Sequence, residues 1–317
     1  MTPDAARSVA VTVPTFRRTE RLDRLLPELL AHARESDGIR VRVIVVDNDP
    51  AQSARGSAER RGVDYVAEPR RGLSAVRNRA IEAALAASAD ALVFIDDDEM
   101  PSHGWLRALT DPWLAGFAEI VAGEVVSTFD TALDPWIEAG GFFRRVRFAE
   151  GEHMAAAPTN NLLLDLATVE RLGLRFDERF AGSGGEDIFF TRQARAGGAR
   201  IVSAPAARVS DPVPADRLTR RWVLLRAFRV GTTTVRGDVL LAADRATAMA
   251  RRVRWGAAGL LRTVVGVARA LWGRLTRSVT HDARGMRLAA RGAGMTAGAL
   301  GLHYREYSRR EKAGRVS

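Results

Sequence analysis

The sequence predicts an α/β protein in which a mostly parallel β-sheet is flanked by helices and followed by a basic helical extension. Strand and helix patterns alternate over the first hundred residues. A fully apolar segment, Ala91–Ile95, runs directly into a row of acidic residues, and basic residues crowd the last third of the chain. We expect a first domain over residues 1–213 and a helical region over residues 214–317.

The first half of the chain supplies the elements of this sheet in order. Strand patterns cover residues 8–14, 40–46, 63–67 and 91–95. Helix patterns lie between them, one with leucines on a single face over 22–30 and one rich in alanine over 73–87. Pro27 either ends a short first helix or kinks a longer one. Alternation of this kind favours parallel strands joined by helices.

The middle of the chain is more mixed. We expect strands at 120–126 and 161–165 and a helix at 188–196. Residues 136–148 indicate a loop or a short amphipathic segment, and prolines at 205, 212 and 214 punctuate the end of the first domain.

Asp96, Asp97, Asp98 and Glu99 follow the buried strand pattern at 91–95. Four neighbouring carboxylates repel one another, and hard divalent cations take carboxylate oxygens, so a cation is the partner we favour. The alternative is a solvated acidic turn. A site is the better interpretation because open α/β sheets bind ligands where their strands end.

Composition describes an ordinary globular protein, with 317 residues, 46% hydrophobic and 27% charged. The chain has no cysteine, which excludes disulfides and thiolate metal sites and fits a reducing cytosol. Residues 1–8 lack the apolar stretch of a signal peptide. We expect no membrane span, because no run of 18 uncharged apolar residues occurs.

Charge is distributed unevenly. From Pro212 to the end the chain carries 22 Lys and Arg against 6 Asp and Glu. An anionic membrane surface and nucleic acid are the two candidate partners for such a region, and no recognition-helix pattern favours nucleic acid. Residues 255–275 are mostly apolar, with arginines on roughly one stripe, as in a helix lying in a membrane interface. The alternative is that these helices pack on the first domain or on each other.

Polar clusters stand at the ends of three expected strands: Pro14–Arg17, Asp47–Asp49 and Asp96–Asp98. The ends of parallel strands share one edge of the sheet, so the three clusters are expected to converge on one crevice. Asp47 can accept a hydrogen bond from a ring N–H of a nucleotide base.

Arginines follow at the start of the next helix. Arg71 precedes the helix that carries Arg77, Asn78 and Arg79, where arginines and backbone N–H groups suit a diphosphate. One of the two helical arginines, Arg77 or Arg79, is expected to be a solvated helix residue.

Glu186 and Asp187 follow the flexible loop Gly182–Gly185. Such a loop can close over a substrate, and a carboxylate beside it can act as general base toward a hydroxyl. The alternative is a helix N-cap, a role that suits Asp187 better than Glu186.

Five ordered motifs carry a resemblance to a known family. They are Val11–Arg17, Val45–Asn48, Gly72–Asn78, Phe94–Asp98 and Gly184–Asp187. Together they resemble the inverting glycosyltransferase family 2, which has the GT-A fold, over roughly residues 8 to 230. Residues 209–214 with 222–231 are similar to its bacterial exopolysaccharide branch, the succinoglycan-type enzymes.

The resemblance implies a role for each matched residue. Asp187 is implied as catalytic base, with Glu186 beside it. The triplet is implied to be a DXD motif that touches ribose and holds Mg²⁺ or Mn²⁺. Since side chains of an extended segment alternate, Asp96 and Asp98 should share one face, Asp97 the other. The implied nucleotide-sugar-binding residues are Pro14, Thr15, Arg17, Asp47, Arg71, Arg77, Asn78, Asp96 and Asp97. The implied metal ligands are Asp98, Asp96 and Asp211, the last at a position where many relatives carry histidine or glutamate.

The function this implies is transfer of a sugar, with inversion, from a nucleotide donor (a UDP-sugar) to a hydroxyl of a lipid-linked or cell-envelope glycan. The expected location is cytoplasmic, peripheral at the inner face of the plasma membrane. One alternative is a nucleotidyltransferase acting on sugar phosphates, but residues 13–20 lack the glycine and lysine of its phosphate loop. The other is a non-catalytic, nucleotide-binding, membrane-docking protein. The oligomeric state stays open.

Overall fold

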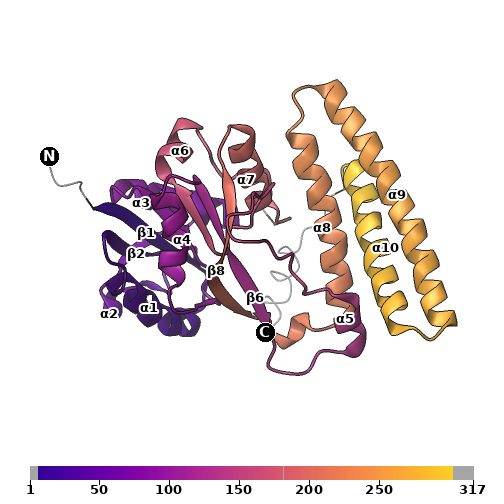
Figure 1. Cartoon of the computed structure of the whole chain (residues 1–317), viewed down its shortest axis with the longest axis horizontal. Helices are drawn as coiled ribbons and strands as arrows, with labels where there is room; N and C mark the ends of the chain where they lie inside the picture. The colour runs from indigo at the N-terminus through magenta and orange to yellow at the C-terminus, as the bar shows by residue number, and fades with distance from the viewer. Residues whose placement is uncertain (1–5, 181, 303–317) are drawn as a thin grey trace. The chain divides into compact units, whose positions relative to one another are not determined.

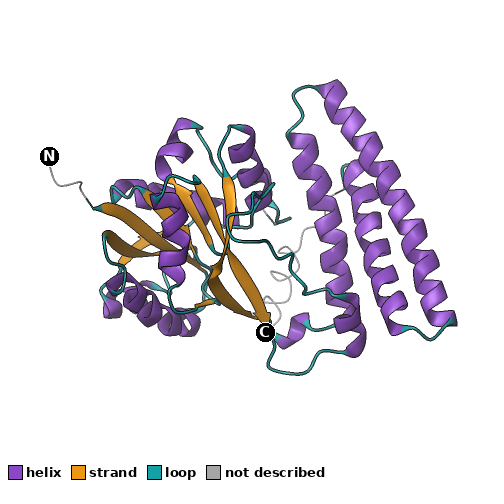
Figure 2. Cartoon of the chain, viewed as in Figure 1, coloured by secondary structure: helices purple, strands orange, loops and turns teal. Residues whose placement is uncertain are grey.

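The computed structural model describes residues 6–180 and 182–302. Across these residues, eight strands form one mixed sheet in the order β3-β2-β1-β4-β7-β6-β8-β5, flanked by helices (Figures 1 and 2). The predicted α/β class and C-terminal helical region are confirmed.

The strands and helices have the following bounds. The strands are β1 (Arg7–Thr15), β2 (Ile39–Asp47), β3 (Asp64–Ala67), β4 (Ala91–Phe94), β5 (Met100–Pro101), β6 (Ile120–Thr128), β7 (Leu162–Asp165) and β8 (Ile201–Pro212). The helices are α1 (Thr19–Arg34), α2 (Arg55–Arg61), α3 (Leu73–Ala86), α4 (Trp105–Leu114), α5 (Pro135–Gly140), α6 (Leu166–Arg171), α7 (Glu186–Ala196), α8 (Arg220–Leu240), α9 (Arg245–Leu275) and α10 (Val279–Ala299).

The parallel half of the sheet is the part that the sequence predicted. β1 pairs in parallel with β2 and β4, and β2 with β3. β7 then pairs antiparallel with both β4 and β6, and β5 with β8. The twelve-residue strand β8 was not predicted, because its prolines suggested punctuation.

The chain divides into two compact units, each described by itself. The first, which we call the sheet unit, comprises residues 6–127, 145–180 and 186–212. The second, the helical unit, comprises residues 128–144, 182–185 and 213–302. The helical unit therefore takes in two segments that the sequence analysis assigned to the first domain.

The sheet unit buries apolar side chains on both faces of its central strands. Val9, Val11 and Val13 of β1 face the cluster formed with α1, α2 and α4. Ala10 and, on β4, Phe94 face the cluster formed with α3, α6 and α7. Strands covered on both faces are continuously apolar, which is why they were readable from the sequence.

Helix α1 continues through Pro27. The leucines on either side of the proline, Leu22 and Leu29, are fully buried against the sheet, and this packing holds both halves in place. Of the two alternatives for Pro27, the ending of a short helix is therefore wrong.

The helical unit consists mainly of α8, α9 and α10, with α5 packed beside α10 (Figure 1). Its small apolar core contains Trp136, Ile137, Phe142, Val223 and Ala283. The segment expected as a loop or short amphipathic element supplies α5 and part of this core. Within the described parts of the chain, no helix combines the length and apolarity needed to cross a membrane.

Candidate active site

The three polar clusters meet at one edge of the sheet, as the parallel topology requires. Thr15 at the end of β1 pairs in register with Asp47 at the end of β2. β4 lies on the other side of β1, where Ile95 N–H donates to the Thr12 carbonyl over 3.3 Å. The convergence predicted from the sequence is confirmed, and all residues described next belong to the sheet unit.

The acidic row forms a tight turn after β4. The Glu99 amide donates to the Asp96 carbonyl over 3.1 Å, and the Asp96 amide donates to a Glu99 carboxylate oxygen over 3.1 Å. Asn160 donates to the other Glu99 oxygen over 2.7 Å. Burial, reinforced by the charge of Asp96, raises the pKa of Glu99 well above its ordinary value. Glu99 thus braces the turn from inside.

Asp97 and Asp98 are both ion-paired with arginines at the start of helix α1. Thr15 Oγ1 donates to Asp97 over 2.7 Å. Arg18 lies 2.8 Å from Asp97 and 3.1 Å from Asp98, and Arg21 lies 2.7 Å from Asp98. The expected alternation, with Asp97 alone on one face, is wrong because the extended backbone ends before the turn at 97–98.

Arg77 connects the acidic turn with the second acidic pair. It is 6% exposed and forms an ion pair of 2.5 Å with Glu186, which is 3% exposed. Burial raises the pKa of Glu186. Burial also raises the pKa of Asp96 to about 6; the nearby charge of Arg77 opposes this rise, and that of Asp98 adds to it. Arg77 therefore pairs directly with Glu186 and is close enough to Asp96 to act on its charge.

The remaining candidate acids are Asp187 and Asp211. Asp187 is half-buried in the first turn of α7, where its Oδ1 accepts the Ile188 amide over 2.7 Å. Asp211 on β8 forms an ion pair of 2.7 Å with Arg145. The charge of Asp211 contributes to the raised pKa of Asp96, so these two carboxylates belong to one electrostatic environment.

Asp47 is fully buried and organises the loop after β2. One carboxylate oxygen accepts the Asp49 amide and the other accepts the Ala54 amide, both over 2.9 Å. The second oxygen also accepts the Tyr65 hydroxyl over 3.1 Å, and burial together with the Asp47 charge raises the pKa of Tyr65 to about 12. The implied bond from Asp47 to a nucleotide base stays a prediction.

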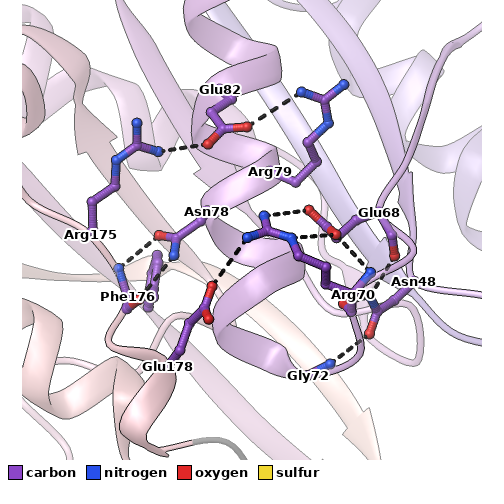
Figure 3. Close-up of polar contacts among 10 residues, drawn as sticks. All are labelled: Asn48, Glu68, Arg70, Gly72, Asn78, Arg79, Glu82, Arg175, Phe176 and Glu178. Atoms are coloured by element: carbon purple, nitrogen blue, oxygen red, sulfur yellow. Dashed lines mark hydrogen bonds and ion pairs between the residues drawn. The ribbon is translucent and has the colours of Figure 1, made fainter.

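Asn48 shapes the loop that presents Arg71. Its amide nitrogen donates to the carbonyls of Glu68 and Arg70, and its amide oxygen accepts the Gly72 amide over 3.1 Å (Figure 3). Gly72 has a φ of 127°, which other residues rarely adopt, so glycine is needed where this loop turns into α3.

Two of the candidate donor-binding arginines flank one exposed aromatic ring. The guanidinium groups of Arg17 and Arg71 lie 5.1 Å and 5.6 Å from the ring centroid of Phe16, within the range of a cation–π contact. Arg17 also forms an ion pair of 3.2 Å with Asp49. Phe16 follows Pro14 and Thr15 at the end of β1, so this cationic group borders the acidic turn.

Asn78 and Arg79 have visible structural partners. Asn78 donates to the Phe176 carbonyl over 2.9 Å and accepts the Phe176 amide over 2.8 Å (Figure 3). This pair of bonds joins α3 to a segment 98 residues later. Arg79 pairs with Glu82 on the surface. The expectation that one of Arg77 and Arg79 is a solvated helix residue is confirmed, for Arg79.

Comparison with known proteins then identifies the family. The model of glycosyl transferase family 2 matches residues 10–165. The succinoglycan biosynthesis protein ExoM of Rhizobium meliloti (strain 1021) is 34% identical over 239 residues, which cover 73% of this chain and 75% of that protein. This chain belongs to glycosyl transferase family 2.

A solved structure agrees with the fold of this family 2 enzyme. The crystal structure of S. aureus TarS aligns with a TM-score of 0.51 over 89% of this chain, at 14% identity. The aligned part spans about 55% of TarS. At this identity the likeness concerns the fold alone.

Enzymes of family 2 typically use a divalent metal ion. Across residues 6–180 and 182–302, no three acidic or histidine side chains are grouped closely enough to ligate a metal together. Mg²⁺ commonly needs only one or two carboxylates, with substrate phosphates and water completing its shell. Asp96 and Asp98 are carboxylates whose charges disfavour one another. These two carboxylates are the candidates to hold such an ion, although Asp98 is already ion-paired with Arg18 and Arg21, and the metal site stays a prediction.

Sequence reasoning missed four residues of the site: Arg18, Arg21, Glu99 as a brace, and Asn160. The arginines looked like the solvated side of an amphipathic helix. Their place in the first turns after β1 was the available signal, since helices that follow parallel strands start at the binding edge. No local signal marks Asn160, which reaches Glu99 across 61 residues of sequence.

Proposed function

We propose that this enzyme transfers a sugar from a nucleoside diphosphate donor, a UDP-sugar, to an acceptor hydroxyl with inversion at the anomeric carbon. The observation that carries the proposal is the position of Arg77. It pairs with Glu186 and acts electrostatically on Asp96, so the acidic turn and the Glu186–Asp187 pair belong to one site. The turn faces the donor and the pair faces the acceptor.

The donor side binds the nucleotide. Asp47 accepts the base N–H, Pro14 and Thr15 line the pocket, and Asn78 and Asp97 complete its wall. The arginines flanking Phe16, Arg17 and Arg71, supply positive charge for a diphosphate, which guanidinium groups bind well. Asp96 and Asp98, with Asp211 as third candidate, would hold Mg²⁺ or Mn²⁺. When bound, the ion supplies a Lewis acid that neutralises charge on the departing nucleoside diphosphate.

The acceptor side performs the proton transfer. The acceptor oxygen attacks the anomeric carbon while the bond from that carbon to the diphosphate oxygen breaks, and the leaving group takes the bonding electrons. Asp187 takes the proton from the acceptor hydroxyl. Glu186, held by Arg77, fixes the first turn of α7 and thereby the position of Asp187.

The acceptor is a lipid-linked or cell-envelope glycan, and the reaction belongs to exopolysaccharide biosynthesis. The naming of the 34% identical relative as a succinoglycan biosynthesis protein supports this choice. We propose that the enzyme acts in the cytoplasm, at the inner face of the plasma membrane, where a lipid-linked acceptor would be anchored.

The Asp187→Asn variant tests the base. It keeps the shape of the side chain but cannot take the proton, so we expect donor binding to be retained and kcat to fall about a thousandfold. Nucleoside diphosphate release measures kcat, and calorimetric titration of each UDP-sugar with Mn²⁺ measures donor binding. Asp111→Asn, an exposed aspartate on α4, is the matched control. A normal kcat in Asp187→Asn removes Asp187 from the base role.

A further inference from the structure

Helix α9 has its smallest residues on the buried side and its large apolar residues on the exposed side. Its buried residues are Gly259, Gly266, Ala270 and Gly273. A Cβ added at Gly266 would lie 2.4 Å from the backbone nitrogen of Ala289, and one at Gly273 would lie 2.2 Å from that of Asp282. The backbones of α9 and α10 therefore touch through glycine, and the fully buried residues of α9 are all glycine or alanine.

The large apolar side chains of α9 point outward. Residues exposed by 44% to 65% recur at spacings of three, four or seven: Met249, Val253, Leu260, Val264, Val267 and Leu271. Leu261, Val265, Trp272 and Leu275 widen the same face, with exposures of 64%, 48%, 57% and 77%. Residues at these spacings share one side of a helix. We call these ten residues the outer face of α9.

An exposed apolar surface of this extent marks an interaction site rather than ordinary solvent exposure. At 31 residues, α9 is about 46 Å long. In a water-soluble helix the large apolar residues normally face the core, whereas close glycine contacts with large residues outside are the pattern of helices that pack in lipid.

Charge decides which partner the outer face suits. Between Arg245 and Leu275, α9 carries seven arginines and no aspartate or glutamate. The side chains of Arg254 and Arg274 are 71% and 59% exposed. By their place in the helical repeat, Arg274 borders the outer face on one side, and Arg254 lies on it at the same angle as Trp272. A second copy of the same face would bring like charges together, but an anionic bilayer offers phosphates to the arginines and acyl chains to the apolar residues.

We infer that the outer face of α9 docks this enzyme on an anionic lipid bilayer, with the helix lying in the interface between headgroups and acyl chains. The helix does not span the bilayer, since none in the described chain meets the requirement for a span. The inference stands independently of the proposed reaction, because it uses only residues of the helical unit.

Flotation of the full-length protein with vesicles tests the inference. We expect binding to vesicles of phosphatidylcholine with phosphatidylglycerol, weaker binding to phosphatidylcholine alone, and loss of binding as salt rises. The combined variant Leu260→Gln, Val264→Gln and Leu271→Gln should partition about a hundredfold less. Phe117→Gln with Val146→Gln, equally exposed residues of the sheet unit, is the matched control and should bind like the unmodified chain.

A second pair of variants tests the arginines without touching the apolar residues. Arg254→Ala with Arg262→Ala should weaken binding about fivefold per arginine. Arg107→Ala with Arg147→Ala, exposed arginines of the sheet unit, removes the same net charge and should leave binding nearly unchanged.

Three results would overturn the inference. The full-length protein could ignore anionic vesicles at low salt, or the triple variant could bind as well as the unmodified chain. Alternatively, light scattering could find a dimer that the triple variant converts to monomer while neither form binds vesicles, which would assign the outer face to a second copy.

Discussion

The two units of this glycosyltransferase bury different kinds of side chain. The sheet unit encloses large residues, among them Trp105, Phe94 and Phe176, each at most 1% exposed. It also encloses a charged pair, Arg77 and Glu186. In the helical unit, α9 and α10 meet through glycine, and ten large apolar residues of α9 stay exposed.

The contrast indicates that the units are stabilised in different ways. The sheet unit is stabilised because folding removes apolar surface from water. The buried charges of its candidate site oppose this, since desolvating a charge costs free energy. The α9–α10 pair is stabilised by close backbone contact and by burial of its outer face against a partner. Three substitutions test this difference between the units.

Arg77→Met should have the largest effect. It leaves Glu186 as a buried, unpaired charge, and breaking such a pair by removing one partner costs about 3–5 kcal/mol of unfolding free energy. Urea unfolding, with hydrogen exchange followed in peptides of α3 and α7, measures the loss. The double variant Arg77→Met with Glu186→Leu should recover most of it.

Arg79→Ala is the matched control on the same helix. It removes an exposed ion pair with Glu82 and should cost under about 1 kcal/mol. Equal losses at Arg77 and Arg79 would show that burial of the pair is not what matters.

Gly266→Val should have the second-largest effect on stability. Its side chain cannot fit beside Ala289 without separating α9 from α10, and overpacking of this kind costs about 3 kcal/mol. Hydrogen exchange in α9 and α10 should accelerate while the sheet unit keeps its protection.

Gly256→Ala is the control in the same helix. Its Cβ meets only the Ala299 Cβ at 3.5 Å, so better helix propensity should leave stability unchanged or higher. Exchange that stays slow in Gly266→Val would contradict the glycine contact.

The smallest expected effect is the pH dependence of stability that comes from His32. His32 is 7% exposed beside Trp105, and burial lowers its pKa below the ordinary value of 6.5, a shift that Glu35 and Glu28 oppose and His103 assists. The unfolded chain therefore binds the proton more readily than the folded one. Neutral His32 therefore makes its full contribution to the free energy of unfolding at pH values above its ordinary pKa of 6.5. This contribution is lost as pH falls through that value.

Urea unfolding between about pH 7.5 and 5.5 checks this sign. His32→Gln should flatten the pH dependence, whereas His281→Gln, at an exposed position in the helical unit, should leave it unchanged. A dependence that survives His32→Gln would assign the effect to another group.

The sequence was sufficient for the parallel half of the sheet and for the edge where its candidate site residues gather. Strands buried on both faces have apolar runs, and their polar ends are conspicuous, as at Asp47 and Asp96. It was insufficient for contacts set by tertiary packing. Arg18 reaches Asp97 across 79 residues, and Asn160 reaches Glu99 across 61.

The helical unit was harder to predict. Glycine inside a helix usually counts against the helix, so Gly259, Gly266 and Gly273 gave no signal of close packing. The alternation assigned to Asp96–Asp98 failed because a turn, set by the Asp96–Glu99 hydrogen bonds, replaces the extended backbone there.

The bonds from α3 to the middle of the chain also set an order of assembly during synthesis. Thr15, Arg18 and the acidic turn are all made within the first hundred residues, so their contacts with one another can form early. Arg77 pairs with Glu186, which is synthesised 109 residues later, and Asn78 bonds to Phe176, 98 residues later. At about 5–20 residues per second, the ribosome needs roughly 5–20 s to supply that interval. Of the residues in these contacts, Arg77 and Asn78 are therefore the last to meet the partners named here.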